Sequence, residues 1–326
     1  MPSRKIEQQI EKLKSLRAST PSDETLVVLK KALADRANLV VAKAASVTAE
    51  LNLHSLIPDL LNAFERLFDN GAESDPQCWG KNAISKALKD LEYLESRPYL
   101  LGIHYVQMEP VWGKRVDTAM TLRGTCALAL VDCRDLPRED KLRHLTDSLT
   151  DAETPVRMDV TRALAQMEGI EPALLLRLKA RTGDENAGVT GQVLESLLNL
   201  EGKIALAFVT AFLRAPDDEI REEAALALGA SRLPGAVSVL IEAWNNTPGS
   251  AFREVLLRSI SASRQQSAIE FLLHIVREDR ERDALAALKA LELHRGSTEI
   301  HRQIAKAVHD RPEPSLQEQF RTYLKE

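Results

Sequence analysis

The sequence predicts an all-α fold, a right-handed α-solenoid of about eight to nine helical hairpins. Apolar residues recur three and four positions apart, as the buried face of a helix requires. Prolines return at roughly the length of one helix plus one turn, and proline is favoured in the first turn of a helix. Aromatic residues make up only 4%, and Ala and Leu dominate the apolar set, which suits closely packed helices.

A repeated helix pattern carries most of this prediction. Its clearest copy is residues 151–167, an Asp followed by a Thr-Pro helix start, a Val-Arg pair and an apolar stripe. The first apolar residues of the second helices align as anchors: Val40, Leu122, Val156, Val189, Ile220 and Phe252. The last four anchors are 33, 31 and 32 residues apart, a period typical of helical repeats. We expect the residues four and eight positions after each anchor to share its buried face.

The first third of the chain predicts helices of uneven length. Residues 6–16 have apolar positions on one face and mixed charges, which indicates an amphipathic helix and not a signal peptide. Thr20-Pro21 offers an N-cap and a first-turn proline for the next helix. The expected helices here are 6–16, 20–34, 39–51 and 53–68.

The middle of the chain interrupts the pattern. A longer helix is expected from Asp75-Pro76 to Arg97-Pro98. Residues 99–114 contain two glycines and a proline without a helical period, so we expect an ordered loop there. Helices then resume in regular pairs. We expect a single solenoid domain over 1–326, divided into irregular N-terminal repeats (1–70), a broken repeat with an aromatic loop (71–116), regular repeats (117–293) and a C-terminal cap (294–326).

Composition narrows the class of function. A net charge of -5 and the absence of a continuous basic track make nucleic acid an unexpected partner. No apolar run is long enough for a transmembrane helix, and three cysteines without a CxxC pair favour a reducing, cytoplasmic location. The sequence has no HExxH, GxSxG, P-loop or GxGxxG motif. His294, His301 and His309 are better explained as solvated helix residues than as metal ligands, so we expect no cofactor, no metal and no catalytic residue.

The repeat resembles the HEAT-repeat family, in particular the short HEAT-like repeats of phycobilin lyases, whose fold is an armadillo-type superhelix. The motif is an Asp in the turn, a Val-Arg pair and an Ala-Leu-Gly near the helix end, as in Asp217, Ile220-Arg221 and Ala227-Leu228-Gly229. The resemblance implies that Asp and Arg side chains tie neighbouring repeats together, a structural role for Asp151, Arg157, Asp217 and Arg221. Deoxyhypusine hydroxylases, which are HEAT-like, carry His-Glu dipeptides as iron ligands. No His here precedes a Glu.

Aromatic residues cluster where the repeat is broken. Five of the seven Tyr and Trp residues lie between positions 79 and 112. Because Tyr and Trp combine contact area with a polar group, this segment predicts a recognition surface. The expected partner-binding residues are Trp79, Tyr99, His104, Tyr105, Met108 and Trp112. The alternative is a hydrophobic cluster that holds a long connection on the solenoid.

The outward positions of the second helices mix both charges with neutral groups, as in Lys43, Thr125 and Asp159. This pattern fits either a solvated helix face or a polar groove for a protein. The predicted function is therefore a non-catalytic scaffold that binds a protein partner on the inner face or through residues 99–114. The alternative is a HEAT-like enzyme, either of the bilin lyase type or of the DNA glycosylase type with Trp79, Trp112 and Arg123 around a base. The oligomeric state is left open.

Overall fold

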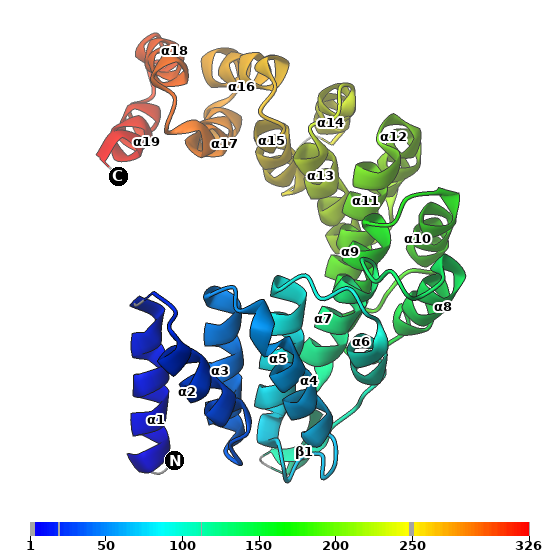
Figure 1. Ribbon diagram of the computed structural model, residues 1–326. Coiled ribbons are helices and arrows are strands. Elements are labelled where there is room, and N and C mark those ends of the chain that lie inside the picture. Colours follow the sequence, from blue (N-terminus) through cyan, green and yellow to red (C-terminus); the bar gives the residue numbers. More distant parts are fainter. Residues whose placement is uncertain (1–3, 19, 112, 248–250, 326) are drawn as a thin grey trace. The chain divides into compact units, whose positions relative to one another are not determined.

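Helix α1 (Arg4–Ser15) precedes nine successive pairs of helices in the computed structural model, which describes residues 4–18, 20–111, 113–247 and 251–325 (Figure 1). The first helices of the pairs are α2 (Asp23–Leu33), α4 (Ile57–Arg66), α6 (Arg97–Gly102), α8 (Arg138–Ser148), α10 (Ile170–Thr182), α12 (Lys203–Thr210), α14 (Ala236–Asn245), α16 (Gln266–Glu278) and α18 (Thr298–His309). The second helices are α3 (Asn38–Glu50), α5 (Trp79–Asp90), α7 (Met120–Leu130), α9 (Thr154–Ala165), α11 (Ala187–Glu201), α13 (Asp218–Ser231), α15 (Phe252–Ala262), α17 (Glu281–Leu291) and α19 (Pro314–Lys325). This arrangement confirms the all-α solenoid of helical hairpins.

The helix pairs form two units, Met1–Met167 and Glu168–Glu326. In the N-terminal unit, α1, α3, α5, α7 and α9 pack each against the next. In the C-terminal unit, α11, α13, α15, α17 and α19 do the same. Each first helix packs on its own second helix, so each unit has two layers. The prediction of one continuous domain over 1–326 stays a prediction.

The core lies along the predicted stripe. The residues at the anchors, and four and eight positions later, are buried in every aligned helix except at Ile220, which is partly exposed. Val156, Val160 and Leu164 on α9, for example, have no exposed surface. Within each unit, a helix pair buries such apolar side chains against its neighbouring pairs, and the hydrophobic effect stabilises the stack. The prediction of the core is confirmed.

Two predicted helix boundaries are wrong for reasons of capping. The N-cap of α2 is Ser22, whose side chain accepts a hydrogen bond from the Thr25 amide, so this helix begins later than Thr20. The helix expected up to Arg97-Pro98 already ends at Asp90. Pro98 instead lies in the first turn of α6, where its missing N–H has no helical partner to lose.

The expected loop 99–114 is also corrected. Its first residues complete α6, and its last form a two-stranded hairpin of β1 (Met108–Val111) and β2 (Lys114–Asp117). The strands are antiparallel, with Met108 opposite Asp117 and Val111 opposite Lys114. Gly113 has a φ of +81°, which the hairpin turn requires and a residue without a Cβ adopts at low cost. Strands of four residues are too short to give a clear alternating pattern in the sequence.

Candidate functional site

Tyr99, a predicted partner-binding residue, belongs to the core. Its side chain on α6 has no exposed surface, and its hydroxyl donates a hydrogen bond of 3.0 Å to the carbonyl oxygen of Tyr93. Burial raises the pKa of the Tyr99 phenol well above its ordinary value. A side chain in this position cannot contact a partner while α6 is folded, so the prediction for Tyr99 is corrected.

Tyr105 attaches the segment before the hairpin to the helices beneath it. Its ring meets the Phe68 ring edge to face, with 4.7 Å between centroids, and its hydroxyl donates to Oε1 of Gln107 at 3.0 Å. The Lys81 ammonium lies 5.3 Å from the centroid of the Tyr105 ring, within range of a cation–π interaction. For Tyr99 and Tyr105, the alternative interpretation of a cluster that holds a long connection fits the contacts better than a recognition surface.

The other predicted partner-binding residues belong to different elements, as far as the structure describes them. His104 is exposed, and its Nε2 lies 3.0 Å from Nδ1 of His144 on α8. Burial and the neighbouring His144 lower the pKa of His104. Met108 is exposed on the hairpin, and Trp112 lies outside the described residues. Trp79 begins α5, where its Nε1 donates to Oε1 of Gln77 at 3.0 Å.

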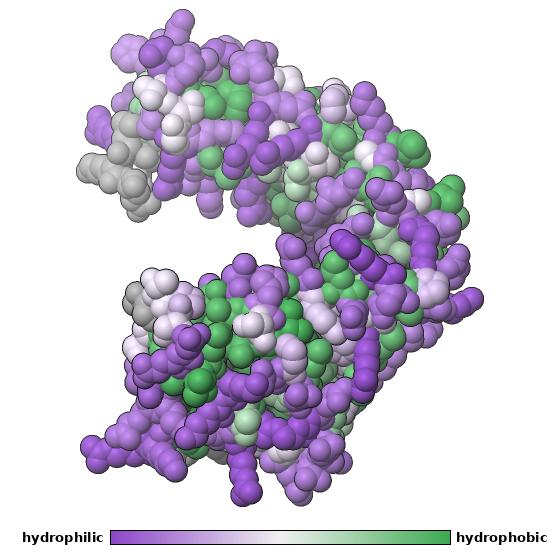
Figure 2. All heavy atoms as spheres, in the orientation of Figure 1, coloured by the Kyte–Doolittle hydropathy of each residue, from purple (hydrophilic) through white to green (hydrophobic). Residues whose placement is uncertain are grey.

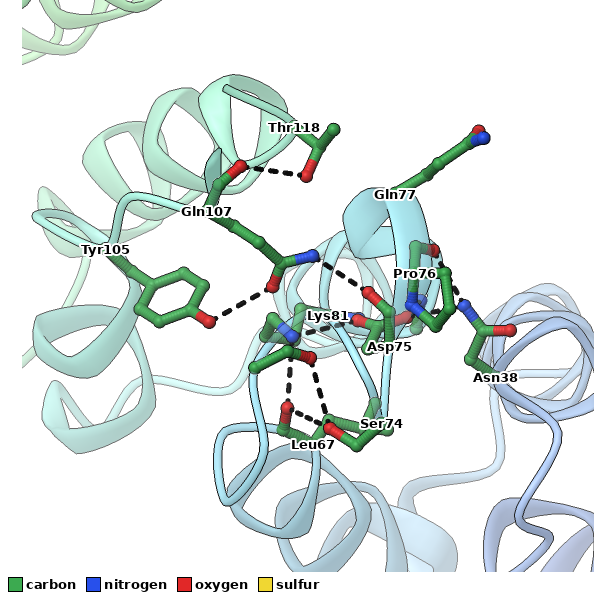
Figure 3. A network of polar contacts seen from close by, with 12 residues as sticks. Asn38, Leu67, Ser74, Asp75, Pro76, Gln77, Lys81, Tyr105, Gln107 and Thr118 are labelled. Carbon is green, nitrogen blue, oxygen red and sulfur yellow. Dashed lines mark hydrogen bonds and ion pairs between the residues drawn. The ribbon is translucent and has the colours of Figure 1, made fainter. Parts of the chain in front are cut away.

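A buried polar network, which the sequence did not reveal, holds α3, α5 and the hairpin segment together (Figure 3). At its centre, Nζ of Lys81 lies 3.2 Å from Oδ2 of Asp75, and both side chains are fully buried. Asp75 also accepts hydrogen bonds from the amides of Gly80 and Lys81, each at 2.8 Å, and from Nδ2 of Asn38 at 2.8 Å. Such a charge pair is stable in a core only when its remaining hydrogen-bonding groups are satisfied.

The same network fixes the start of α5 and the base of the hairpin. The short helix η3 (Pro76–Cys78) comes directly before α5. Its residues Gln77 and Cys78 have φ values of 57° and 56°, and this left-handed backbone separates η3 from the helix that begins at Trp79. Oε1 of Glu109 accepts from the Gln77 amide, from Nε2 of Gln107 and from the Thr118 hydroxyl, each at 2.7 Å. Gln107 donates also to the carbonyl oxygen of Asp75 at 2.9 Å. Three hydrogen bonds to one carboxylate oxygen therefore position β1 beside Trp79.

Arg123 on α7 makes the tie between helix pairs that the resemblance implied for Asp151. Its Nε and Nη2 donate to the two carboxylate oxygens of Asp151 at 2.7 and 2.9 Å, and its Nη1 donates to Asp117 at 2.5 Å and to the carbonyl oxygen of Tyr105 at 2.9 Å. The Arg123 side chain is almost completely buried. The planar guanidinium group suits a contact with two carboxylates, because it presents its N–H donors in a fixed, forked geometry.

The other residues predicted to tie repeats make local contacts. Nη1 of Arg157 donates to the carbonyl oxygens of Asp151 and Ala152, at 2.8 and 3.0 Å. Arg221 makes the same kind of contact with Ala215 and Pro216 and an ion pair with Asp218. Asp217 caps α13 by accepting from the amides of Glu219 and Ile220, at 2.8 and 3.4 Å.

The sequence does contain a signal for the buried polar network. An acidic residue precedes a basic one by six positions in three places: Asp75 and Lys81, Asp117 and Arg123, and Asp151 and Arg157.

A groove of about 480 Å³ opens on the second-helix face of the N-terminal unit. It is lined by residues of α1, α3, α5 and α7, and its surface is largely apolar. Its apolar wall comprises Ile10, Leu39, Ala42, Trp79 and Ala83. In Figure 2, apolar residues gather around α3 and α5 among hydrophilic side chains. Trp79 is 51% exposed, which is unusual for the largest apolar side chain.

Polar side chains line the groove beside Trp79. Lys43 on α3, and Asn82 and Lys86 on α5, line it together with Thr121 and Thr125 on α7. Lys43 is partly buried, and burial, with Arg17 nearby, lowers the pKa of its ammonium group. Oδ1 of Asn82 is buried and accepts no hydrogen bond. An apolar hollow with a few convergent polar groups is the usual form of a binding site.

Reactive and metal-binding groups do not gather in the described part of the chain. The described residues contain no group of three or more His, Cys, Asp and Glu side chains that could hold a metal ion. The three cysteines are free and buried, and burial raises the pKa of the Cys78 thiol to about 12, which disfavours the reactive thiolate. His294 contacts Ser261, whereas His301 packs on Phe320. Within the described ranges, no helix combines the length and apolar character needed to cross a membrane.

Sequence comparison agrees with the helix pairs. Residues 171–261 and 205–292 match a family model of HEAT repeats. HEAT repeats are therefore identified over residues 171–292. These matched HEAT repeats lie in the C-terminal unit and include the helices from α11 to α17.

A structure of human deoxyhypusine hydroxylase in complex with glycerol is 19% identical, over 81% of this chain and 92% of that chain, with a TM-score of 0.31. A likeness this low carries no argument about fold or function. No curated protein sequence matches the chain.

Proposed function

We propose that the protein is a non-catalytic cytoplasmic scaffold that binds a partner protein in the groove of its N-terminal unit. The observation that carries this proposal is the half-exposed Trp79 beside an apolar hollow. Exposed Trp residues in such hollows commonly contribute most of the binding free energy of protein interfaces. HEAT repeats provide a rigid surface for this task, because each helix is held by its neighbours. The free cysteines fit a reducing compartment.

The lining of the groove favours a protein over a nucleic acid. Only two lysines lie among its lining residues, and Lys86 already pairs with Asp90. Nucleic acid binding requires several unpaired cations along a track. The arrangement of Trp79 and Arg123 around a flipped base is also disfavoured, because Arg123 is buried between Asp117 and Asp151 and is not among the groove residues. The described residues show no arrangement that favours the glycosylase alternative.

The hairpin offers a second surface for the same function. Val106, Met108, Val111 and Val116 are each at least 40% exposed, although they are apolar. Exposed apolar side chains on a hairpin are suited to protein contact, and the strand register places Met108 and Val116 on its two opposite faces. The groove is preferred because its aromatic side chain lies in a concave site, where a partner side chain loses more water on binding.

Affinity purification with two pairs of substitutions separates these surfaces. The groove variant is Trp79→Ala with Ala83→Glu, the hairpin variant is Met108→Ser with Val116→Ser, and Val27→Ser changes an exposed apolar residue of α2 as a control. Circular dichroism first establishes that each variant is folded. We expect quantitative mass spectrometry to find a protein that the wild type, the control and the hairpin variant retain and that the groove variant loses. Unchanged capture by the groove variant would overturn the proposal.

A further inference from the structure

Lys43 differs from three other cations in and around the groove, which form ion pairs. Lys14 of α1 lies 2.6 Å from Glu11, Arg17 forms an ion pair with Glu50, and Lys86 forms one with Asp90. Lys43 lies inside the groove, and it makes no hydrogen bond or ion pair with any residue that the structure describes. The residues that line the groove include no carboxylate, so Lys43 brings a positive charge into it without an ion-pair partner among the described residues.

The position of Lys43 makes this charge available to a ligand. The side chain is partly buried, so its ammonium group has lost part of its water shell, and the nearby carboxylates of Glu50 and Glu11 pair with Arg17 and Lys14 and not with Lys43. A carboxylate that reaches it would form a charge-assisted hydrogen bond in surroundings of low polarity. Such a bond is stronger than the same contact on an open surface.

The neighbouring helix presents the complementary groups. Trp79, Asn82, Ala83 and Lys86 are spaced three and four residues apart, so they share one face of α5. Trp79 and Ala83 offer apolar contact on this face, whereas Oδ1 of Asn82 is buried and out of reach of a ligand. The axes of packed helices lie about 8 to 10 Å apart. We therefore expect roughly this distance between Lys43 on α3 and the groove face of α5.

We propose that the groove binds an extended segment of a partner protein in which an acidic and an apolar side chain stand two positions apart. The acidic side chain pairs with Lys43, and the apolar one packs on Trp79 and Ala83. Residues two apart in an extended chain point to the same side and are separated by about 7 Å, close to the spacing of the two helices. This inference rests on the proposed function.

A display library of random heptapeptides tests the sequence preference directly. Selection is carried out on the full-length wild type, on Lys43→Met, on Lys43→Gln as a polar replacement, and on Lys86→Met as a matched control in the same groove. We expect the wild type and Lys86→Met to enrich peptides with Asp or Glu two positions from an apolar residue. Both Lys43 variants should keep the apolar preference and lose the acidic one.

Fluorescence polarisation with the most enriched peptide measures how much the contact between Lys43 and the acidic residue contributes to affinity. Replacing its acidic residue by the corresponding amide should weaken binding to the wild type about tenfold, and binding to Lys43→Met less than about twofold. Enrichment of apolar peptides without an acidic residue, or an equal loss in Lys86→Met, would overturn the inference alone. If selection on the wild type enriches no peptide more strongly than selection on the Trp79→Ala variant, the proposed binding function of the groove itself is wrong.

Discussion

Lys81 and Asp75 form an ion pair in which neither side chain has any exposed surface, with 3.2 Å between Nζ and Oδ2. Lys81 also donates to the carbonyl oxygen of Leu67 at 3.0 Å, so its charge is satisfied by two groups within the α4–α5 pair. The pair links α5 to the loop that follows α4, on the face of α5 opposite to the groove. The orientation of Trp79 therefore depends on a charge in the core.

Removal of the Lys81 charge should destabilise the N-terminal unit strongly. Lys81→Met keeps the length of the side chain but leaves the Asp75 carboxylate buried without its counter-ion. We expect the free energy of unfolding to fall by about 3 to 5 kcal/mol, measured by urea denaturation. Lys86→Met removes the exposed partner of Asp90 and should cost less than about 1 kcal/mol. Equal effects of the two substitutions would show that the buried pair contributes nothing beyond a surface pair.

Asp151 and Asp217 occupy the same motif position, yet they should differ in importance. Asp151 receives two hydrogen bonds from Arg123, whereas the described contacts of Asp217 are those of a helix cap. Asp151→Ala should lower the free energy of unfolding by roughly 3 kcal/mol, because a buried guanidinium loses one of its two carboxylates. Asp217→Ala should cost about 1 kcal/mol. Chemical denaturation of the two variants side by side measures the difference, and a larger loss for Asp217→Ala would contradict it.

Gly229 marks a close approach of α13 and α15 in the C-terminal unit. A Cβ at this position would lie 2.2 Å from the carbonyl oxygen of Ser259, which belongs to the backbone and cannot rotate away. We expect Gly229→Ala to destabilise by about 1 to 3 kcal/mol through forced separation of the helices. Gly296 has no atom within 4 Å of an added Cβ, so Gly296→Ala should change stability by less than about 0.5 kcal/mol. Thermal unfolding of both variants tests this, and equal melting temperatures would count against the close contact.

His104 should contribute to the loss of stability in acid. Burial first, and then the neighbouring His144, lower the pKa of His104 in the folded protein, while Asp147 and Asp151 oppose the shift. His104 therefore binds a proton more readily in the unfolded chain than in the folded one. The free energy of unfolding falls as the pH drops through the pKa of the unfolded histidine, about 6.5. His104→Gln should flatten the dependence of the unfolding midpoint on pH between roughly 7 and 5. A variant with the same slope as the wild type would show that His104 does not take part.

Local periodicity explains which parts of the fold were predictable. Val156, Val160 and Leu164 follow the helical period, so the sequence alone assigns them to the core. The partner of Asp151 is different, because Arg123 stands 28 residues earlier and reaches it only through the packing of α7 on α9. The resemblance indicated this kind of contact for Asp151 but did not point to Arg123 as its partner. The left-handed backbone at Gln77 likewise depends on Glu109, far along the chain.

The candidate site was predictable in parts. Lys43 and Thr125 were recognised as outward residues of second helices, and Trp79 as a partner-binding residue. Asn82 and Lys86 were missed, because α5 carries no aligned anchor that would have fixed its outward face. Tyr99 was misassigned because composition alone does not distinguish a buried tyrosine from an exposed one.

The division of α5 into two faces has a consequence for engineering. The core contacts of this helix come from Gly80, Lys81 and Ile84, while the groove uses Trp79, Asn82, Ala83 and Lys86. The two sets share no residue. Randomising the groove positions should therefore yield variants of new specificity that keep the parent's fold, with α5 as an interchangeable recognition element.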